Sequence, residues 1–274
     1  MSSQFMKLKE TATQVRKDIV TMIHAASSGH PGGSLSAADI LTYLFFEKMN
    51  INPENPKMDG RDKFVLSKGH AAPVLYSSLA RRGFFDPELL LTLRKTGSLL
   101  QGHPDMKSIP GVEMSTGSLG QGISTAVGMA LANKIDNSDA KTYVLLGDGE
   151  MNEGIVWEAL MAANHYKLNN LTAILDFNGL QIDGKNEDVM SISPIDKKFE
   201  SFGWNVIVCD GHDFESIAEA FAKCDEEKEG PSVIIAKTVK GKGVSFMEDQ
   251  AGWHGKAPSD EELSIALKEL GGAL

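Results

Sequence analysis

Two polar clusters about thirty residues apart carry the densest potential chemistry in the sequence. The first is Gly-Asp-Gly-Glu at residues 147 to 150, and the second is Asp-Phe-Asn-Gly-Leu at residues 176 to 180. Each follows a short apolar run. A strand-helix-strand crossover takes roughly 30 residues, so Asp148 and Asn178 should follow neighbouring strands. In open α/β sheets ligands bind beyond the carboxyl ends of the strands, so both side chains are placed where a ligand is expected.

The residue types in these clusters indicate a metal and a phosphate rather than a dinucleotide. Glycines let the backbone approach a bulky anion, but the Asp148 carboxylate would repel a phosphate unless a divalent cation lay between them. Asp148, Asn178 and a backbone carbonyl are hard oxygen ligands that suit Mg²⁺ or, more loosely, Ca²⁺. A dinucleotide fingerprint has different glycine spacing and no acid in the loop. Gly-Asp-Gly alone is equally a common turn, so the prediction depends on the pair.

Histidine provides a second candidate set. Four of the seven histidines lie in Gly/Pro-rich segments predicted to be loops, and these are His30, His70, His103 and His254. Imidazoles in loops could donate to a diphosphate or to sugar hydroxyls, or transfer protons near neutral pH. Zinc binding is an alternative, although none of the four shows a short His-x-x-x-His spacing. The remaining three, His24, His165 and His212, are predicted to be structural or on the surface.

A third cluster, Thr-Gly-Ser-Leu-Gly-Gln-Gly at residues 116 to 122, precedes a small-residue helix predicted over 123 to 132. Two interpretations are open. Backbone groups at the start of this helix could contact an anion or a flat cofactor ring. The small residues could instead serve only close helix packing.

The elements that must position these residues follow from hydrophobic periodicity. Helices are predicted over residues 8 to 26, from Ser34 or Ser36 to 49, from 71 to 82 and from 87 to 96. Strands are predicted at 64 to 67, 142 to 146, 171 to 176, 204 to 209 and 232 to 239. Ser259 and Glu262 form a capping-box pattern for a last helix. The alternation predicts a three-layer α/β/α fold with a mainly parallel central sheet, in a single domain spanning 1 to 274.

Composition excludes several classes of partner. The 274 residues carry a net charge of −10, which argues against nucleic acid or an anionic membrane surface. The two cysteines, Cys209 and Cys224, predict buried thiols in a reducing compartment. No apolar run approaches the ~18 residues of a membrane span, and the first residues lack a signal-like stretch. We therefore expect a cytoplasmic protein.

Taken in order, these segments resemble the thiamine diphosphate-binding half of transketolase, from about residue 11 to the last predicted helix. The matching segments are Ser-Gly-His-Pro-Gly at 28 to 32, Gly-His-Ala at 69 to 71, Gly-His-Pro at 102 to 104, Ser-Leu-Gly-Gln-Gly at 118 to 122, Gly-Asp-Gly at 147 to 149, Glu-Gly at 153 to 154 and His-Gly at 254 to 255. The family usually has Pro in place of Ser118 and Glu in place of Asp105. Neither departure removes an essential functional group.

The resemblance implies roles for individual residues. It implies Mg²⁺ held by Asp148, Asn178 and the carbonyl of Leu180. It implies diphosphate contacts from His70, Gly149, Asn178 and His254, and cofactor-ring contacts from Ser118, Leu119 and Gly120. It implies that His30, His103 and His254 are catalytic and face the ketose. Glu153, counted here with the cofactor-binding residues, and Glu158 resemble acidic residues near the contact between cofactor sites.

The resemblance also implies an activity and a partner. The activity is that of a transferase of carbohydrate metabolism, in the pentose phosphate pathway, which moves a two-carbon ketol unit from a ketose phosphate to an aldose phosphate. Only 20 residues follow His254, whereas transketolases continue with a pyrimidine-binding domain that promotes formation of the cofactor ylide and binds sugar phosphate. We expect that domain on an obligate partner chain, in a heterotetramer with two copies of each subunit.

The sequence leaves alternative functions open. One is a split enzyme for another ketose, such as a sulfonated or branched sugar phosphate. Another is a noncatalytic scaffold that keeps the Mg²⁺-diphosphate site, although four loop histidines exceed what a scaffold needs. Synthases that make deoxyxylulose phosphate share the Gly-Asp-Gly motif but resemble the other segments less closely.

Overall fold

The computed structural model describes residues 3–271, so the ends of the predicted domain, residues 1–2 and 272–274, lie outside the described residues. At its centre is a five-stranded sheet of order β1-β2-β3-β7-β6. The strands are β1 (Lys63–Leu66), β2 (Thr142–Gly147), β3 (Leu171–Phe177), β6 (Asn205–Asp210) and β7 (Ser232–Lys237). All neighbouring pairs are parallel. The predicted sheet is confirmed, and strand ends differ from the prediction by at most two residues.

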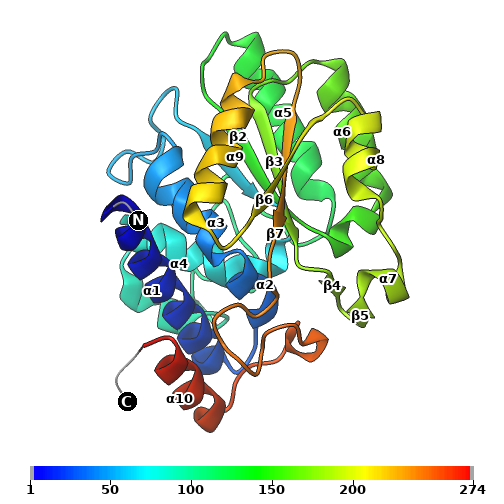
Figure 1. Ribbon diagram of the computed structural model, residues 1–274. Coiled ribbons are helices and arrows are strands. Elements are labelled where there is room, and N and C mark those ends of the chain that lie inside the picture. The colour runs from blue at the N-terminus through cyan, green and yellow to red at the C-terminus, as the bar shows by residue number, and fades with distance from the viewer. Residues whose placement is uncertain (1–2, 272–274) are drawn as a thin grey trace.

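Alternating strand residues pack on opposite faces of the sheet and build two apolar cores. In β2, Tyr143 and Leu145 belong to one core, and Val144 and Leu146 belong to the other. The first core contains side chains from α1 (Ser3–Ala26), α3 (Ala38–Tyr43), α4 (Ala72–Arg82) and α9 (Phe214–Glu226). The second contains side chains from α5 (Gln121–Ile135), α6 (Gly154–His165) and α8 (Ile195–Ser201). The sheet lies between these helices, which confirms the predicted three-layer fold (Figure 1).

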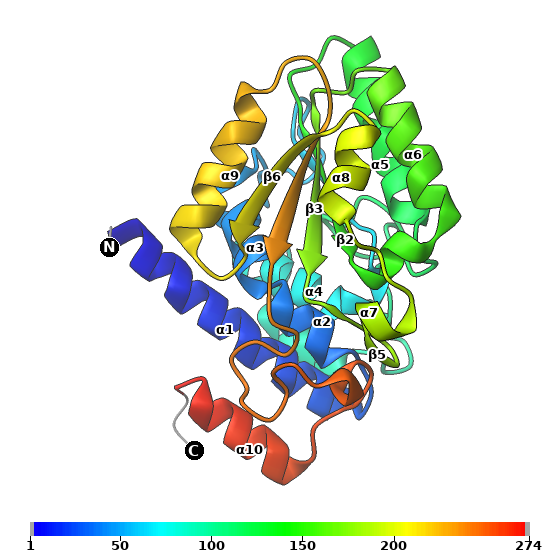
Figure 2. The same cartoon turned by 45° about the vertical axis from the view of Figure 1, so that its right-hand side comes forward.

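Parallel pairing brings the carboxyl ends of all five strands to one edge of the sheet. Figure 2 shows the arrowheads of β3, β6 and β7 pointing toward α2 (Pro31–Ser36) and the segment that holds β4 (Leu180–Gln181) and β5 (Gly184–Lys185). Gly147 in β2 is in register with Asp176 in β3. The loop that starts with Asp148 and the loop after β3 therefore leave the sheet side by side, as the spacing predicts.

The helix predicted from Ser34 or Ser36 to 49 is wrong as a continuous element. It divides into α2, α3 and a π-helical turn at Leu44–Lys48. Pro31 takes the first helical turn, where its missing N–H costs nothing. The serines do not cap because their hydroxyls are used elsewhere: Ser34 donates to the His30 carbonyl at 2.8 Å, and Ser36 donates to the Asp176 carboxylate at 2.5 Å.

The helix predicted over 87 to 96 is also shorter than expected. The chain forms a 3₁₀-helix at Pro87–Thr92, capped by the Asp86 side chain, and then turns at Arg94, whose φ is +59°. Helix α5 extends the predicted 123 to 132 segment at both ends. The remaining elements are 3₁₀-turns at Gly69–Ala71, Gly149–Asn152 and Ala251–Trp253, with α7 (Asn186–Val189) and α10 (Asp260–Glu269). The capping box of Ser259 and Glu262 is confirmed at the start of α10.

Two further expectations concern cysteines and membranes. Both cysteines are buried free thiols, as predicted. Within residues 3–271 no helix combines the length and apolarity needed to cross a bilayer.

Two glycines of α5 provide a matched test of its packing. A Cβ on the buried Gly122 would lie 2.5 Å from Ser67 Cα at the end of β1, whereas a Cβ on Gly128 would meet nothing within 4 Å. Gly128→Ala should stabilise the fold by roughly 0.5–1 kcal/mol through helix propensity. Gly122→Ala should destabilise it by about 1–3 kcal/mol through overpacking. Urea unfolding measures both, and equal stability of the two variants would contradict the close approach.

Candidate functional site

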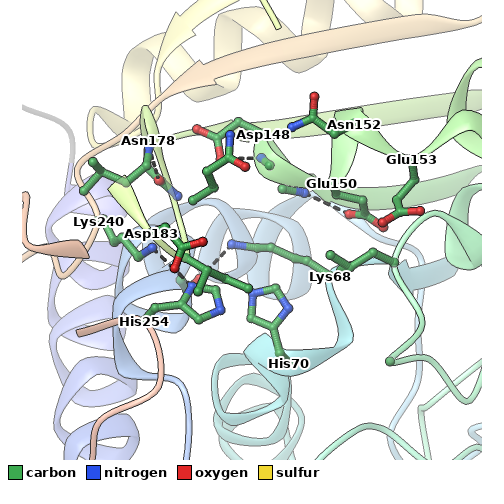
Figure 3. A pocket seen from close by; sticks show the side chains of 18 residues that line it. Lys68, His70, Asp148, Glu150, Asn152, Glu153, Asn178, Asp183, Lys240 and His254 are labelled. Atoms are coloured by element: carbon green, nitrogen blue, oxygen red, sulfur yellow. Dashed lines mark hydrogen bonds between the residues drawn. The ribbon is translucent and has the colours of Figure 1, made fainter. Parts of the chain in front are cut away.

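A cavity of about 400 Å³ opens at the carboxyl edge of the sheet, beyond β1, β2, β3 and β7 (Figure 3). Eight of the predicted site residues line it, namely His70, Leu119, Asp148, Gly149, Glu153, Asn178, Leu180 and His254. These residues come from five separate segments of the chain. The fold therefore brings together the two polar clusters predicted from the sequence, which contain Asp148 and Asn178, and two of the four loop histidines, His70 and His254.

Asp148 follows β2 and is almost fully buried. Its Oδ1 accepts a hydrogen bond from Gly149 N at 2.8 Å, and its Oδ2 accepts from Gly179 N at 2.6 Å and from Asn186 Nδ2 at 2.9 Å. Burial, reinforced by the charge of Asp176, raises the pKa of Asp148 to about 6. A carboxylate desolvated in this way gains strongly from a nearby cation.

Asn178 is oriented by its neighbours on both sides. Its Oδ1 accepts from Leu180 N at 3.1 Å, and its Nδ2 donates to Asp176 Oδ2 at 3.5 Å. Asp176 is fully buried and forms an ion pair with Lys68. Although burial opposes ionisation, the Lys68 ammonium lowers the pKa of Asp176 below its ordinary value. The charged Asp176 thus aligns the amide of Asn178 beside Asp148.

Glu150 is a buried carboxylate that joins three segments of the cavity wall. It accepts from Ser67 Oγ at 2.5 Å, from Gly120 N at 2.7 Å and from Gly147 N at 3.0 Å. Burial raises the pKa of Glu150. Because its oxygens tie the ends of β1 and β2 to the start of α5, Glu150 holds the wall together.

Three of the loop histidines form a compact cluster. The ring centroids of His70 and His254 are 5.1 Å apart, and His30 lies 5.3 Å from the first and 5.4 Å from the second. Burial and nearby cations lower the pKa of His30 and of His254 to about 4, and that of His70 well below 6.5. All three rings are neutral at pH 7, so each has one nitrogen that donates and one that accepts. His30 Nδ1 is buried without a hydrogen-bond partner.

Two buried lysines make one end of the cavity positive. Figure 3 shows the amino groups of Lys68 and Lys240 entering from two sides above His70 and His254. Lys240 is 2% exposed, its Nζ lies 3.2 Å from His254 Nδ1, and burial lowers its pKa to about 8. Lys68 also donates to the Gly33 carbonyl at 2.7 Å. This end of the cavity is suited to an anion.

The other four predicted residues do not line the cavity, and these are His30, His103, Ser118 and Gly120. His30 reaches it only through the histidine cluster. His103 packs on Gly117, where an added Cβ would lie 3.1 Å from its ring. Gly120 N is bonded to Glu150, so only Leu119 of the predicted ring-contact segment forms part of the wall.

Sequence reasoning missed several residues of the wall. Lys68 and Lys240 lie two and three residues beyond the last residues of β1 and β7. The rule that located Asp148, a polar residue just past a strand, would also have found them. Glu150 was visible in the first cluster but unassigned. Ile182 and Asp183 lie between β4 and β5, in a segment with no periodic signal.

Comparison with known proteins gives a consistent result. Residues 8–273 match the family described as the transketolase, thiamine diphosphate binding domain. A subunit of the apulose-4-phosphate transketolase of Phocaeicola vulgatus is 46% identical, over 93% of this chain and 90% of that protein. The 6-deoxy-6-sulfo-D-fructose transketolase subunit SqwG of a Clostridium species is 42% identical, over 98% of both. Human transketolase is 46% identical, over 96% of this chain and 42% of its own length.

Solved structures agree. Transketolase from Campylobacter jejuni superposes with a TM-score of 0.92 at 36% identity, covering 99% of this chain and 43% of that one. The chain thus spans nearly the full length of the two subunits but about two fifths of the longer transketolases.

The histidine cluster predicts a dependence of stability on pH. Unfolded histidines titrate near pH 6.5, whereas His30 and His254 titrate at about 4 in the fold. Between these values the unfolded state binds more protons than the folded state. The free energy of unfolding therefore keeps its full value above pH ~6.5 and decreases as the pH falls toward 4. Urea unfolding from about pH 4.5 to 7.5 should show a shallower dependence for His30→Gln and His254→Gln than for wild type. Parallel curves for all three proteins would refute the assignment.

Proposed function

The chain belongs to the transketolase thiamine diphosphate-binding domain family, and from this premise we propose that it is the cofactor-binding subunit of a two-chain transketolase. The observation that carries the proposal is the cavity in which Asp148 and Asn178 face a positive end made by Lys68 and Lys240, beside the neutral rings of His70 and His254. The proposed reaction transfers a two-carbon ketol unit from a ketose phosphate to an aldose phosphate.

The donor set fits a divalent metal ion. The buried Asp148 carboxylate, the Asn178 amide oxygen and the Leu180 carbonyl are hard oxygen ligands on two adjoining loops. Such ligands suit Mg²⁺, with Ca²⁺ as a substitute. The raised pKa of Asp148 supports this role, since a cation would compensate the desolvated charge.

The opposite end of the cavity fits a diphosphate. Gly33 lies on its wall, and a Cβ there would stand 3.6 Å from Lys68 Nζ and 3.7 Å from His70 Nε2. Glycine therefore keeps this positive end open. We assign the diphosphate contacts to His70, Gly149, Asn178 and His254, and add Lys240, whose ammonium reaches the same end.

The middle of the cavity is suited to the cofactor rings. Leu119 and Ile182 contribute apolar side chains to the wall, and Glu153 contributes a carboxylate. Ser118 and Gly120 flank Leu119 and shape the backbone at this point. We therefore assign cofactor binding to the residues that the sequence predicted here, Ser118, Leu119, Gly120 and Glu153. The structure adds Ile182.

Thiamine diphosphate, when bound, supplies a nucleophilic carbon and an electron sink for cleaving a ketose. The residues of this chain would hold the cofactor and move protons at the substrate oxygens. We assign that proton transfer to His30, His103 and His254, of which the first and last have neutral rings at pH 7 that can donate and accept. General acid-base catalysis of this kind contributes about 10²- to 10⁴-fold per group.

We further propose that the pyrimidine-binding domain belongs to a separate partner chain. Residues 1–274 would form one domain, the active sites would lie at the interface of the two chains, and a cytoplasmic heterotetramer would contain two copies of each. Two relatives named as transketolase subunits support this, because they match over nearly their whole length.

The ketose is the open part of the proposal. The pentose phosphate pathway reaction is our first candidate and is consistent with 46% identity to human transketolase. A split enzyme for a branched or sulfonated ketose is the second candidate, because the two subunit relatives are named for apulose 4-phosphate and 6-deoxy-6-sulfo-D-fructose. A noncatalytic scaffold is less well supported, because the diphosphate contacts assigned above leave His30 and His103 without a role.

Copurification tests the two-chain proposal. The tagged chain, isolated from its native cell, should retain a partner that restores ketol transfer, whereas the purified chain alone should show little. Three donors assayed in parallel, a linear ketose phosphate, apulose 4-phosphate and 6-deoxy-6-sulfo-D-fructose, would identify the substrate class. Robust turnover by the chain alone would overturn the need for a partner.

A substitution tests the proposed metal ligand. Asp148→Asn removes the charge and one of the oxygens, so Mg²⁺-dependent binding of thiamine diphosphate should weaken by at least about tenfold. Asp183→Asn is the matched control, since it removes an exposed carboxylate from the same cavity and should change the affinity by less than about threefold. Calorimetry of the partner-bound complex measures both, and an unchanged affinity in Asp148→Asn would exclude it as a ligand.

A further inference from the structure

A charged network lies behind the cavity and lines none of it. Arg16 of α1 makes two bonds to Asp39 of α3, from Nη1 to Oδ1 at 2.9 Å and from Nη2 to Oδ2 at 2.5 Å. His212, after β6, donates from Nδ1 to Asp39 Oδ2 at 2.8 Å. The three side chains are 9%, 8% and 14% exposed, respectively. A buried carboxylate with two such partners is charged and firmly held.

This network ends on the backbone to either side of Lys240. Val239 N donates to His212 Nε2 at 2.9 Å, and Arg16 Nε donates to the Lys242 carbonyl at 3.1 Å. Because Nε2 accepts, the ring proton must lie on Nδ1, where it is given to Asp39. Asp39 therefore selects the His212 tautomer that can bind the Val239 amide.

The segment after β7 has little freedom to move once these bonds are made. Gly241 N donates to the Gly32 carbonyl at 3.0 Å, and Gly211 N donates to the Lys237 carbonyl at 2.8 Å. A Cβ on Gly211 would lie 2.5 Å from Thr238 Cγ2, and a Cβ on Gly243 would lie 3.1 Å from Arg16 Cδ. The loop that carries Lys240 is thus packed tightly against the network.

We propose that Asp39 and His212 are positioning residues, which hold the Val239 amide so that the Lys240 ammonium reaches the cavity beside His254. Lys240 has a long, flexible side chain, so the placement of its ammonium depends on where the backbone holds its Cα. The ion pair of Lys68 and Asp176 is anchored separately, from the loop after β1 and from β3, although Thr238, the residue before Val239, also donates to Asp176. The importance of Lys240 for anion binding rests on the proposed function, whereas its placement does not.

Two substitutions of His212 separate the roles of its nitrogens. Gln places a polar atom near the position of Nε2 and can still accept from Val239 N. Asn places its polar atoms near Nδ1, so it can donate to Asp39 but leaves the Val239 amide unpaired. The two variants have similar chemistry and differ in the bond that the proposal requires.

Lysine labelling on the full chain without cofactor tests the placement. An amine-acylating reagent, followed by mass spectrometry, should modify Lys240 about tenfold faster in His212→Asn than in wild type, as expected for loss of a buried hydrogen bond. His212→Gln should stay near the wild-type rate. Lys68, which is also 2% exposed, is the internal control and should label equally slowly in all three proteins.

Several outcomes would overturn the proposal. One is an equal labelling rate of Lys240 in the Asn and Gln variants. Another is a matching rise in the labelling rate of Lys68, which would indicate that the substitution destabilises the whole fold. If His212→Asn fails to fold, hydrogen exchange of the Val239 amide in wild type decides the question. Slow exchange supports the bond to His212, and exchange at the rate of an exposed amide refutes it.

A measurement of cofactor affinity distinguishes failure of this proposal from failure of the proposed function. In the partner-bound complex, thiamine diphosphate with Mg²⁺ should bind about tenfold more weakly to His212→Asn than to wild type, and His212→Gln should be close to wild type. Absence of binding in all three proteins would refute the proposed function while leaving the labelling result intact. Weaker binding without a change in Lys240 labelling would refute the positioning role alone.

Discussion

The buried ion pair of Lys68 and Asp176 is the interaction on which the rest of the site depends. Asp176 is fully buried and also accepts from Ser36 of α2 and from Thr238 beyond β7, while Lys68 extends from the loop after β1. One carboxylate thus joins four segments that are distant in sequence. Removing either partner of such a pair leaves an uncompensated buried charge at a cost of about 3–5 kcal/mol. The carboxyl edge of the sheet is therefore held rigidly, because its parts cannot separate without exposing that charge.

Rigidity at this edge explains how two like charges can lie close together. Asp148 follows the strand next to Asp176, and the charge of Asp176 helps to raise its pKa. Asp176 is compensated by Lys68, whereas Asp148 is held by backbone and amide donors only. Hydrogen bonds from neutral donors offset part of the desolvation of a carboxylate but leave its charge in place. The fold therefore leaves the residue proposed to bind the metal as a buried carboxylate with no cation bonded to it.

Local rules predicted the fold and the pairing of Asp148 with Asn178 from the sequence, but long-range contacts lay beyond them. Strand patterns and a thirty-residue spacing are local, so they located the two loops correctly. Ser36, predicted as a possible cap of the helix reaching residue 49, instead bonds to Asp176, which is 140 residues away. The clustering of His30 with His254 is equally non-local. His212 was predicted to be structural or on the surface, and only its contact with Asp39 shows which backbone amide it can hold.

The charges of the cavity favour a ligand that carries both signs. At one end burial disfavours the anionic form of Asp148, and at the other it disfavours the cationic forms of Lys240 and the histidines. A free diphosphate would compensate the second end but would be repelled by the first, and a free cation would do the reverse. A diphosphate that brings its own divalent metal ion satisfies both ends at once, since each charge then lies beside its opposite. Metal and diphosphate should therefore enhance each other's binding, because either one removes the repulsion that the other would meet.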